Sequence, residues 1–174
     1  MSEVYVIDSN AFMQAKQKFY AFDICPGYWT ALIWHQQAGV LRSVDRVRDE
    51  IEAGGDDLWE WVQNSFPESG FAETGVPEVL AKYGQLQQWV NGNALYTPAA
   101  KLEFADEKNA DGWLVAYAMT LKKGVVVTME DFNAEKRNKV PIPNLGSAFG
   151  IESITPFEML RRLQVGLNWS AAPS

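Results

Sequence analysis

One stretch near the amino terminus decides the fold: Val4-Tyr5-Val6-Ile7-Asp8-Ser9-Asn10-Ala11-Phe12. Its apolar first part is rich in β-branched residues and too short to span a membrane, so it predicts a buried β-strand over residues 4–7. Asp8 then stands at the carboxyl end of this strand, and in an open α/β sheet that edge is where ligands bind. The alternative is that Asp8 or Ser9 only caps the helix that follows.

The chain is long enough for one domain with a full hydrophobic core. It has 174 residues, of which 47% are hydrophobic and 13% are aromatic. Such a composition favours a folded protein over a disordered one. We expect a single domain over residues 1–166 and a loose tail over residues 167–174.

Several features predict a cytoplasmic protein without a membrane partner. No apolar run approaches the roughly 20 residues that a transmembrane helix needs. Glu3 precedes the first strand directly, which does not fit a signal peptide. The single cysteine, Cys25, excludes an internal disulfide framework and a cysteine-based zinc site.

The net charge of −7 argues against a generic nucleic-acid coat protein, which is usually basic. It is compatible with an enzyme that gathers carboxylates around a divalent metal ion and brings phosphates in through that ion. The only histidine, His35, stands among apolar residues of a predicted helix. We interpret it as an ordinary packed or surface residue and not as part of a catalytic triad.

Short apolar strands alternate with helical segments along the chain. Strands are predicted at residues 4–7, 40–44, 125–128 and 151–154, and helices at 11–18, 28–38, 77–91, 98–106, 109–123 and 156–164, with two more helices between the second strand and Pro67. Residues 67–75 and 129–144 are predicted as loops. This alternation favours an α/β fold with three layers, α/β/α, around a short-stranded and mostly parallel sheet.

Four acids stand next to strand ends or helix starts. Asp8 ends the first strand, Glu50 lies on the helix after the second, Asp111 opens the helix 109–123, and Glu130 follows the strand 125–128. In a parallel sheet these places can meet at the carboxyl edge. Carboxylates gathered there repel one another unless a cation lies among them, and oxygen ligands select Mg²⁺ or Mn²⁺.

Each acid also has a simpler interpretation. Glu50 can be a solvated helix residue, Asp111 can complement the helix dipole, and Glu130 and its neighbour Asp131 can be loop acids. The joint placement of the four favours the metal site.

Four segments of the chain together resemble the acidic motifs of PIN domains. They are residues 7–10 (IDSN), 47–51 (VRDEI), 110–118 (ADGWLVAYA) and 126–132 (VVTMEDF). The resemblance covers about residues 3–165, and its strength lies in the order of the four motifs and not in any one of them. It implies a PIN-like fold and a metal-dependent ribonuclease of the toxin type, whose partners are RNA and a cognate antitoxin.

The resemblance also assigns roles to residues. It implies that Asp8, Glu50, Asp111 and Glu130 hold the metal and carry catalysis, with Asn10 and Thr128 at polar supporting positions. The fourth acid is Glu where Asp is more common, and Asp131 is the alternative for that role. The segment 139–145 is not a general PIN feature and suggests a separate PIN-like subfamily.

The leading hypothesis is a Mg²⁺- or Mn²⁺-dependent endoribonuclease in which Lys136, Arg137 and Lys139 contact RNA phosphates. A solvated loop is the simpler interpretation of these three cations. For the aromatic residues Tyr20, Phe22 and Tyr28, core packing is favoured over base stacking. The rival functions are an inactive PIN-fold binding module and, less favoured, a haloacid-dehalogenase-type phosphatase, which needs an Asp where Asn10 stands. A homodimer is kept as an alternative to a monomer.

Overall fold

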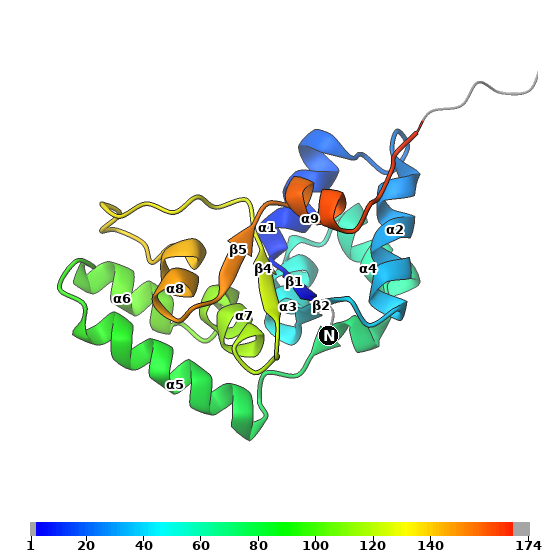
Figure 1. The fold of residues 1–174 in the computed structure, drawn as a ribbon. Helices are drawn as coiled ribbons and strands as arrows, with labels where there is room; N and C mark the ends of the chain where they lie inside the picture. Colours follow the sequence, from blue (N-terminus) through cyan, green and yellow to red (C-terminus); the bar gives the residue numbers. More distant parts are fainter. Residues whose placement is uncertain (1–2, 169–174) are drawn as a thin grey trace, which may run out of the picture.

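A five-stranded parallel sheet runs through the centre of the molecule (Figure 1). The computed structural model describes residues 3–168. The strands are β1 (Val4–Ile7), β2 (Leu41–Val44), β3 (Phe71–Ala72), β4 (Gly124–Val127) and β5 (Glu152–Ile154). They lie in the order β3-β2-β1-β4-β5, and all four strand pairs within residues 3–168 are parallel.

The centre of the sheet is formed by β1 and β4, which pair along their whole length from Val4–Gly124 to Ile7–Val127. Both are continuous runs of apolar residues, as expected for strands that are covered on both faces. The chain leaves β1 toward β2 and β3 and returns to the other side of β1 through β4. The order of the strands therefore reverses between β1 and β4, and open α/β sheets bind ligands at such a reversal point.

Helices cover both faces of the sheet (Figure 1). In chain order they are α1 (Ser9–Gln14), the π-helix η1 (Ala15–Phe19), α2 (Pro26–Gln37), α3 (Asp45–Gly54), α4 (Asp57–Ser65), the 3₁₀ turn η2 (Glu68–Gly70), α5 (Pro77–Gly92), α6 (Pro98–Ala105), α7 (Ala110–Ala118), α8 (Ile142–Ala148) and α9 (Pro156–Arg162). Helices α5 to α8 lie on one side of the sheet, whereas α2, α4 and α9 lie on the other. The predicted three-layer α/β fold is thus confirmed.

The helix α7 is the most deeply buried helix on its side. Nearly all its residues are buried, and it packs against α5, α8 and the central strands. A side chain at Gly112 would collide with the rings of Phe104 and Tyr83, whose atoms lie 2.8 Å from the position of a Cβ there. This close approach holds the first turn of α7 against α5 and α6 and thereby fixes the position of Asp111.

The structure differs from the sequence-based prediction at several element boundaries and in both predicted loops. α2 begins at Pro26, two residues earlier than predicted, because proline suits the first position of a helix. α7 ends at Ala118 and not at residue 123. The predicted loops at 67–75 and 129–144 contain the edge strand β3 and the start of α8, respectively.

The sequence predicts that no segment of the chain spans a membrane. Within residues 3–168, none of the helices combines the length and the apolar character that a bilayer crossing requires. The greater part of the predicted loose tail, residues 169–174, lies outside the described residues.

Candidate acidic site

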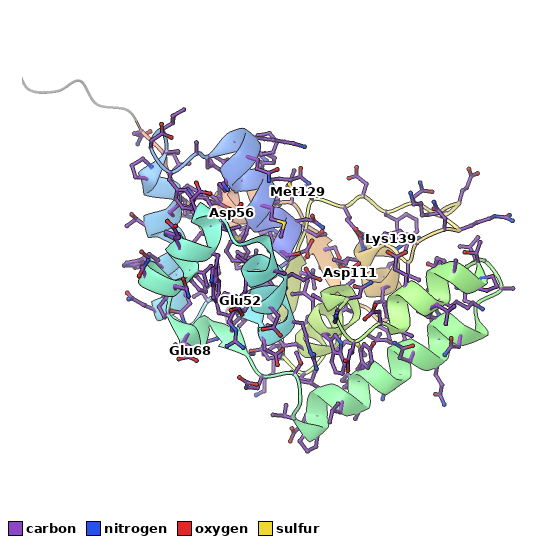
Figure 2. The ribbon with its side chains drawn as sticks, turned by 180° about the vertical axis from the view of Figure 1, so that it is seen from behind. Glu52, Asp56, Glu68, Asp111, Met129 and Lys139 are labelled. Carbon is purple, nitrogen blue, oxygen red and sulfur yellow. The ribbon has the colours of Figure 1, made fainter. Side chains whose placement is uncertain are left out.

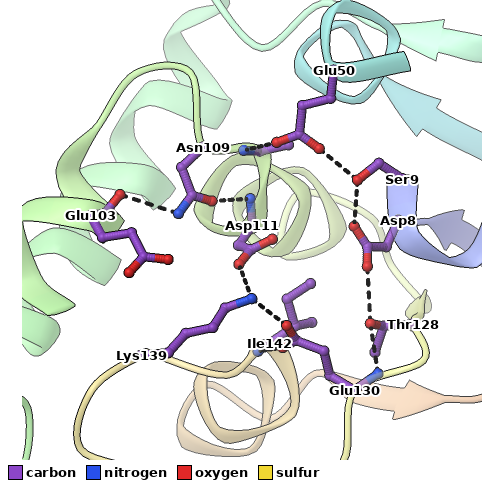
Figure 3. A network of polar contacts seen from close by, with 11 residues as sticks. Asp8, Ser9, Glu50, Glu103, Asn109, Asp111, Thr128, Glu130, Lys139 and Ile142 are labelled. Carbon is purple, nitrogen blue, oxygen red and sulfur yellow. Dashed lines mark hydrogen bonds and ion pairs between the residues drawn. The ribbon is translucent and has the colours of Figure 1, made fainter. Parts of the chain in front are cut away.

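Asp8 is the most buried acid of the molecule and lies at the reversal point of the sheet. It follows β1 directly, and its side chain has no solvent exposure. Its Oδ2 accepts a hydrogen bond of 3.1 Å from the Thr128 hydroxyl, which follows β4 (Figure 3). The two central strands therefore place Asp8 and Thr128 against each other from positions 120 residues apart in the chain.

Glu50 reaches the same place from α3. Its Oε2 accepts a hydrogen bond of 2.5 Å from the Ser9 hydroxyl, and Oε1 accepts one of 3.0 Å from the backbone N–H of Ala110. The Ser9 oxygen also lies 3.3 Å from Oδ1 of Asp8. Ser9 thus links Asp8 to the acid of α3, and Asp8, which stands at the N-cap position of α1, makes no side-chain capping bond.

Asp111 lies in the first turn of α7 and is 8% exposed. Its backbone N–H donates to Oδ1 of Asn109, which caps the helix, while the Asn109 amide donates to the carbonyl of Glu103 (Figure 3). These bonds satisfy one of the free N–H groups at the helix start and fix where α7 begins.

Glu130 is oriented by three groups. Its backbone N–H donates to the Thr128 hydroxyl oxygen at 3.2 Å, and its Oε2 accepts a bond of 2.8 Å from the backbone N–H of Ile142. Its Oε1 forms an ion pair with Lys139. Thr128 and the start of α8 therefore hold the fourth acid in the cluster.

Lys139 is the cation of the cluster. Its Nζ lies 3.2 Å from Oδ2 of Asp111 and contacts Glu130 at the same time. Figure 2 shows Lys139 and Asp111 beside each other, where the segment before α8 passes α7. The segment 139–145 thus supplies both this ammonium and the N–H of Ile142.

The proximity of the acids alters their protonation. Burial and then the nearby Asp111 raise the pKa of Asp8 to about 7, although the hydrogen bond from Thr128 lowers it. Burial likewise raises the pKa of Asp111 to about 6, against the opposing effect of Lys139. For Lys139, burial lowers the pKa, but Asp111 and Glu130 outweigh burial and raise it. The cluster thus sets four carboxyl groups near a single lysine that contacts two of them.

A hollow of about 340 Å³ opens in front of this cluster. Its walls include Ser9, Asn10, Glu50, Asp111 and Lys139. Solvent and small ligands therefore have access to the acids from outside, although Asp8 itself lies behind the wall.

The remaining predicted site residues lie around the cluster. Asn10 lines the hollow, which fits a supporting position. Asp131 is exposed, and it lines a second hollow together with Lys136 and Lys139. Arg137 is exposed, and its carbonyl accepts a bond from the N–H of Thr97.

The aromatic residues considered for base stacking belong to the core or pack against it. Tyr28 is buried and stacks on Tyr20 with ring centres 4.3 Å apart. Phe22 packs against Trp29, with 4.3 Å between the ring centres. His35 is buried on α2, and burial lowers its pKa. These four residues therefore have structural roles, as the simpler interpretation predicted.

The acids can be tested for their fit to a divalent ion. Within residues 3–168, no three His, Cys, Asp or Glu side chains form a ready-made set of metal ligands. The carboxylate oxygens of Glu50 and Glu130 are each engaged with donors of the protein. The donor chemistry still fits, since buried and mutually repelling carboxylates are oxygen ligands that favour Mg²⁺ or Mn²⁺.

Comparisons with known proteins give one match. The family model described as "Domain of unknown function (DUF4411)" matches residues 5–167, which include all four acids, Thr128 and Lys139. No curated protein and no solved structure gave a significant match. Since the family model spans nearly the whole sequence, the chain belongs to the DUF4411 family.

Proposed function

We propose that this protein is a metal-dependent endoribonuclease whose active site is the cluster of Asp8, Glu50, Asp111 and Glu130. One observation carries the proposal: four acids from four elements meet at the reversal point of a parallel sheet, with too little positive charge to balance them. Like charges buried together destabilise a protein, and strongly perturbed carboxylates in a hollow are typical of functional sites.

Asp8 and Asp111 would hold a Mg²⁺ or Mn²⁺ ion, with Glu50 and Glu130 completing the set after they turn from their present partners. Such an ion supplies Lewis acidity for phosphodiester hydrolysis, by activating water and neutralising charge on the phosphate oxygens. Thr128 fixes the carboxylate of Asp8 through its 3.1 Å hydrogen bond. The hydroxyl of Ser9 does the same for Glu50, so these two residues orient the ligands.

The choice of RNA as substrate is supported by the PIN resemblance and by the cations near the site. Lys139 touches the acids, and Lys136 lines the adjoining hollow. Cations so placed can bind backbone phosphates that approach the cluster. Single-stranded RNA is favoured because its backbone can bend into a hollow and its bases are free.

The proposal is tested by incubating single-stranded RNA with the protein and Mn²⁺ or Mg²⁺. Cleavage is expected, EDTA should stop it, and an Asp8→Asn protein purified identically should lack it. Equal cleavage by both preparations would point to a contaminating nuclease and would contradict the assignment of the site.

The position of Lys139 favours a second candidate, a binding module that does not cleave. Its ammonium contacts two of the four acids, so part of the cluster is neutralised without a metal ion. In this alternative the protein binds RNA or another ligand, but a broad panel of RNA is left intact in the presence of Mn²⁺. The same cleavage assay therefore separates the two functions.

The PIN resemblance adds the proposal that the protein is the toxin of a toxin–antitoxin pair. Expression of the chain alone should then arrest growth, and co-expression of the protein encoded by the neighbouring reading frame should relieve the arrest. An Asp8→Asn variant that still arrests growth would separate any toxicity from the acidic cluster.

A further inference from the structure

The loop between β4 and α8 carries an exposed aromatic ring next to the acidic cluster. Phe132 is 59% exposed, and it stands two residues after Glu130. In Figure 1 this loop extends from the end of β4 over the side of the molecule formed by α6 and α8. None of the ring contacts of the described aromatic residues includes Phe132.

The backbone on both sides of Phe132 is held in place. Before it, Glu130 is bound to Thr128, Lys139 and Ile142. After it, both backbone groups of Asn133 bind the side chain of Asn144, since the N–H donates to Oδ1 at 2.9 Å and the carbonyl accepts from Nδ2 at 2.7 Å.

Asn144 is buried on α8, and this pair of hydrogen bonds anchors the loop to the body of the protein. An exposed apolar ring on a mobile loop is unremarkable, but here the loop is fixed from both directions. A side chain whose backbone is already held in position loses less entropy when it binds a ligand, so the arrangement favours binding.

The surroundings of Phe132 define the class of ligand. The ring lines a hollow of about 260 Å³ together with Glu130, Asp131, Lys136 and Lys139. Lys139 also lines the hollow in front of the acids, so the two hollows adjoin. A ligand that spans both must offer a flat apolar face to Phe132 and an anionic group to the lysines. A nucleotide of single-stranded RNA has both features.

Charge alone would bind such a ligand poorly. The two lysines of this wall stand beside the acids Glu130 and Asp131, and the whole protein has a net charge of −7. The acids therefore weaken the attraction of the two lysines for phosphate. The apolar face of a base can bind to this wall without opposing that negative charge.

We propose that Phe132 stacks on a nucleobase of single-stranded RNA next to the acidic cluster, while Lys136 contacts the neighbouring phosphate. This inference rests on the proposed function for its substrate, and it adds the binding subsite. Its test does not require cleavage, so the subsite and the nuclease activity can fail separately.

The experiment measures the affinity of a fluorescein-labelled oligouridylate in EDTA, with all variants made in the Asp8→Asn background. Phe132→Ala should weaken binding by about 5- to 150-fold, the range expected for the loss of one base–aromatic stack. Phe132→Trp should preserve binding. The loss should persist at elevated salt, because stacking does not depend on counterion release.

Trp34→Ala is the matched control. Trp34 is 63% exposed, but it lies in the last turn of α2, which leads to the amino end of β2, whereas the acids lie at the carboxyl ends of the strands. Removing it should leave the affinity unchanged. Equal losses in Trp34→Ala and Phe132→Ala would indicate nonspecific binding and overturn the proposal.

Stacking on one base is examined with RNAs that each lack a single base. At one position of the RNA, removal of the base should weaken binding to the protein that retains Phe132. The same abasic RNA should bind the Phe132→Ala variant as well as the intact RNA does. The subsite would be overturned if Phe132→Ala left the affinity for RNA unchanged. It would also be overturned if, at every position, the loss from removing a base were the same with and without Phe132. In the first case the exposed ring would remain a candidate contact for a protein partner. RNA that binds through Phe132 but is never cleaved with Mn²⁺ would support the subsite and reject the nuclease.

Discussion

The ammonium nitrogen of Lys139, in the loop before α8, lies 3.2 Å from Oδ2 of Asp111 in the first turn of α7. The same nitrogen contacts Glu130. Lys139 therefore partly neutralises these two acids. Under the proposed function it would compete with the metal ion for them and would also stabilise the cluster when the ion is absent.

Replacing Lys139 with Met should separate these two effects. Without metal, Lys139→Met should lower the free energy of unfolding, by about 1–3 kcal/mol once the partial exposure of the pair is considered. With Mn²⁺, the rise in melting temperature should be larger than in the wild type, because no ammonium competes for Asp111 and Glu130. Thermal unfolding with EDTA and with Mn²⁺ measures both. A Mn²⁺ response that shrinks in Lys139→Met would show that Lys139 supports the ion and does not compete with it.

Glu130 and Asp131 form a matched pair for identifying the fourth acid. Glu130 contacts Lys139 and Ile142 within the cluster, whereas Asp131 is exposed. Glu130→Gln should weaken Mn²⁺ binding by about 10-fold or more, and Asp131→Asn, which removes the same charge from the next residue, should leave it nearly unchanged. Calorimetric titration compares the two. Weakening by Asp131→Asn alone would move the fourth ligand by one residue.

The raised pKa of Asp8 gives a stability that depends on pH. The folded protein retains the proton of Asp8 up to about pH 7, whereas the unfolded chain releases it near the ordinary pKa of 3.8. Between these values the folded state binds more protons, so the free energy of unfolding falls as the pH rises. In EDTA, Asp8→Asn should therefore melt above the wild type at pH 8, and this difference should shrink toward pH 4. A difference that does not change with pH would contradict the raised pKa.

Asn109 should influence the site through the position of α7. Its side chain caps the helix at the N–H of Asp111 and binds the carbonyl of Glu103. Asn109→Ala should cost about 0.5–2 kcal/mol of stability and also weaken Mn²⁺ binding, because Asp111 loses its fixed position. Asn109→Asp retains the cap and should be milder. Denaturant unfolding measures the first effect, and a stability equal to that of the wild type would show that packing alone fixes the helix.

The central strands could be predicted because their sequence is locally unambiguous. Residues 4–7 and 125–127 are runs of β-branched and aromatic residues that no helix pattern explains, and they form the paired strands β1 and β4. The capped helix starts at Thr97 and Thr155 were also visible, and both hydroxyls accept the expected backbone bonds. Local chemistry determines these elements, so a single sequence suffices.

The elements that were missed depend on tertiary contacts. β3 has only two residues and exists because it pairs with β2. α7 ends at Ala118 because β4 begins against it, and a Cβ at Gly124 would lie 2.3 Å from the carbonyl oxygen of Ala118. The first turn of α8 falls within residues 129–144, which the sequence predicts as a polar loop.

The same distinction applies to the site. The acids could be listed from their places beside strands and helix starts. The sequence analysis assigns Lys139 to RNA binding and does not predict its place inside the cluster. Its contact with Asp111 joins residues 28 positions apart in the chain, which only the tertiary fold brings together. The role of Ser9 between Asp8 and Glu50, and the anchoring of the Phe132 loop by Asn144, likewise arise only when distant segments meet.

Titration with Mn²⁺ tests most directly the central claim that the acids form one metal site. In the wild type, Mn²⁺ at about 100 times its Kd should raise the free energy of unfolding by about 2.7 kcal/mol, since the ion binds only the folded state. The double variant Asp8→Asn/Asp111→Asn should lose this rise, while Asp131→Asn should retain it. An undiminished rise in the double variant would place the ion elsewhere and contradict the account.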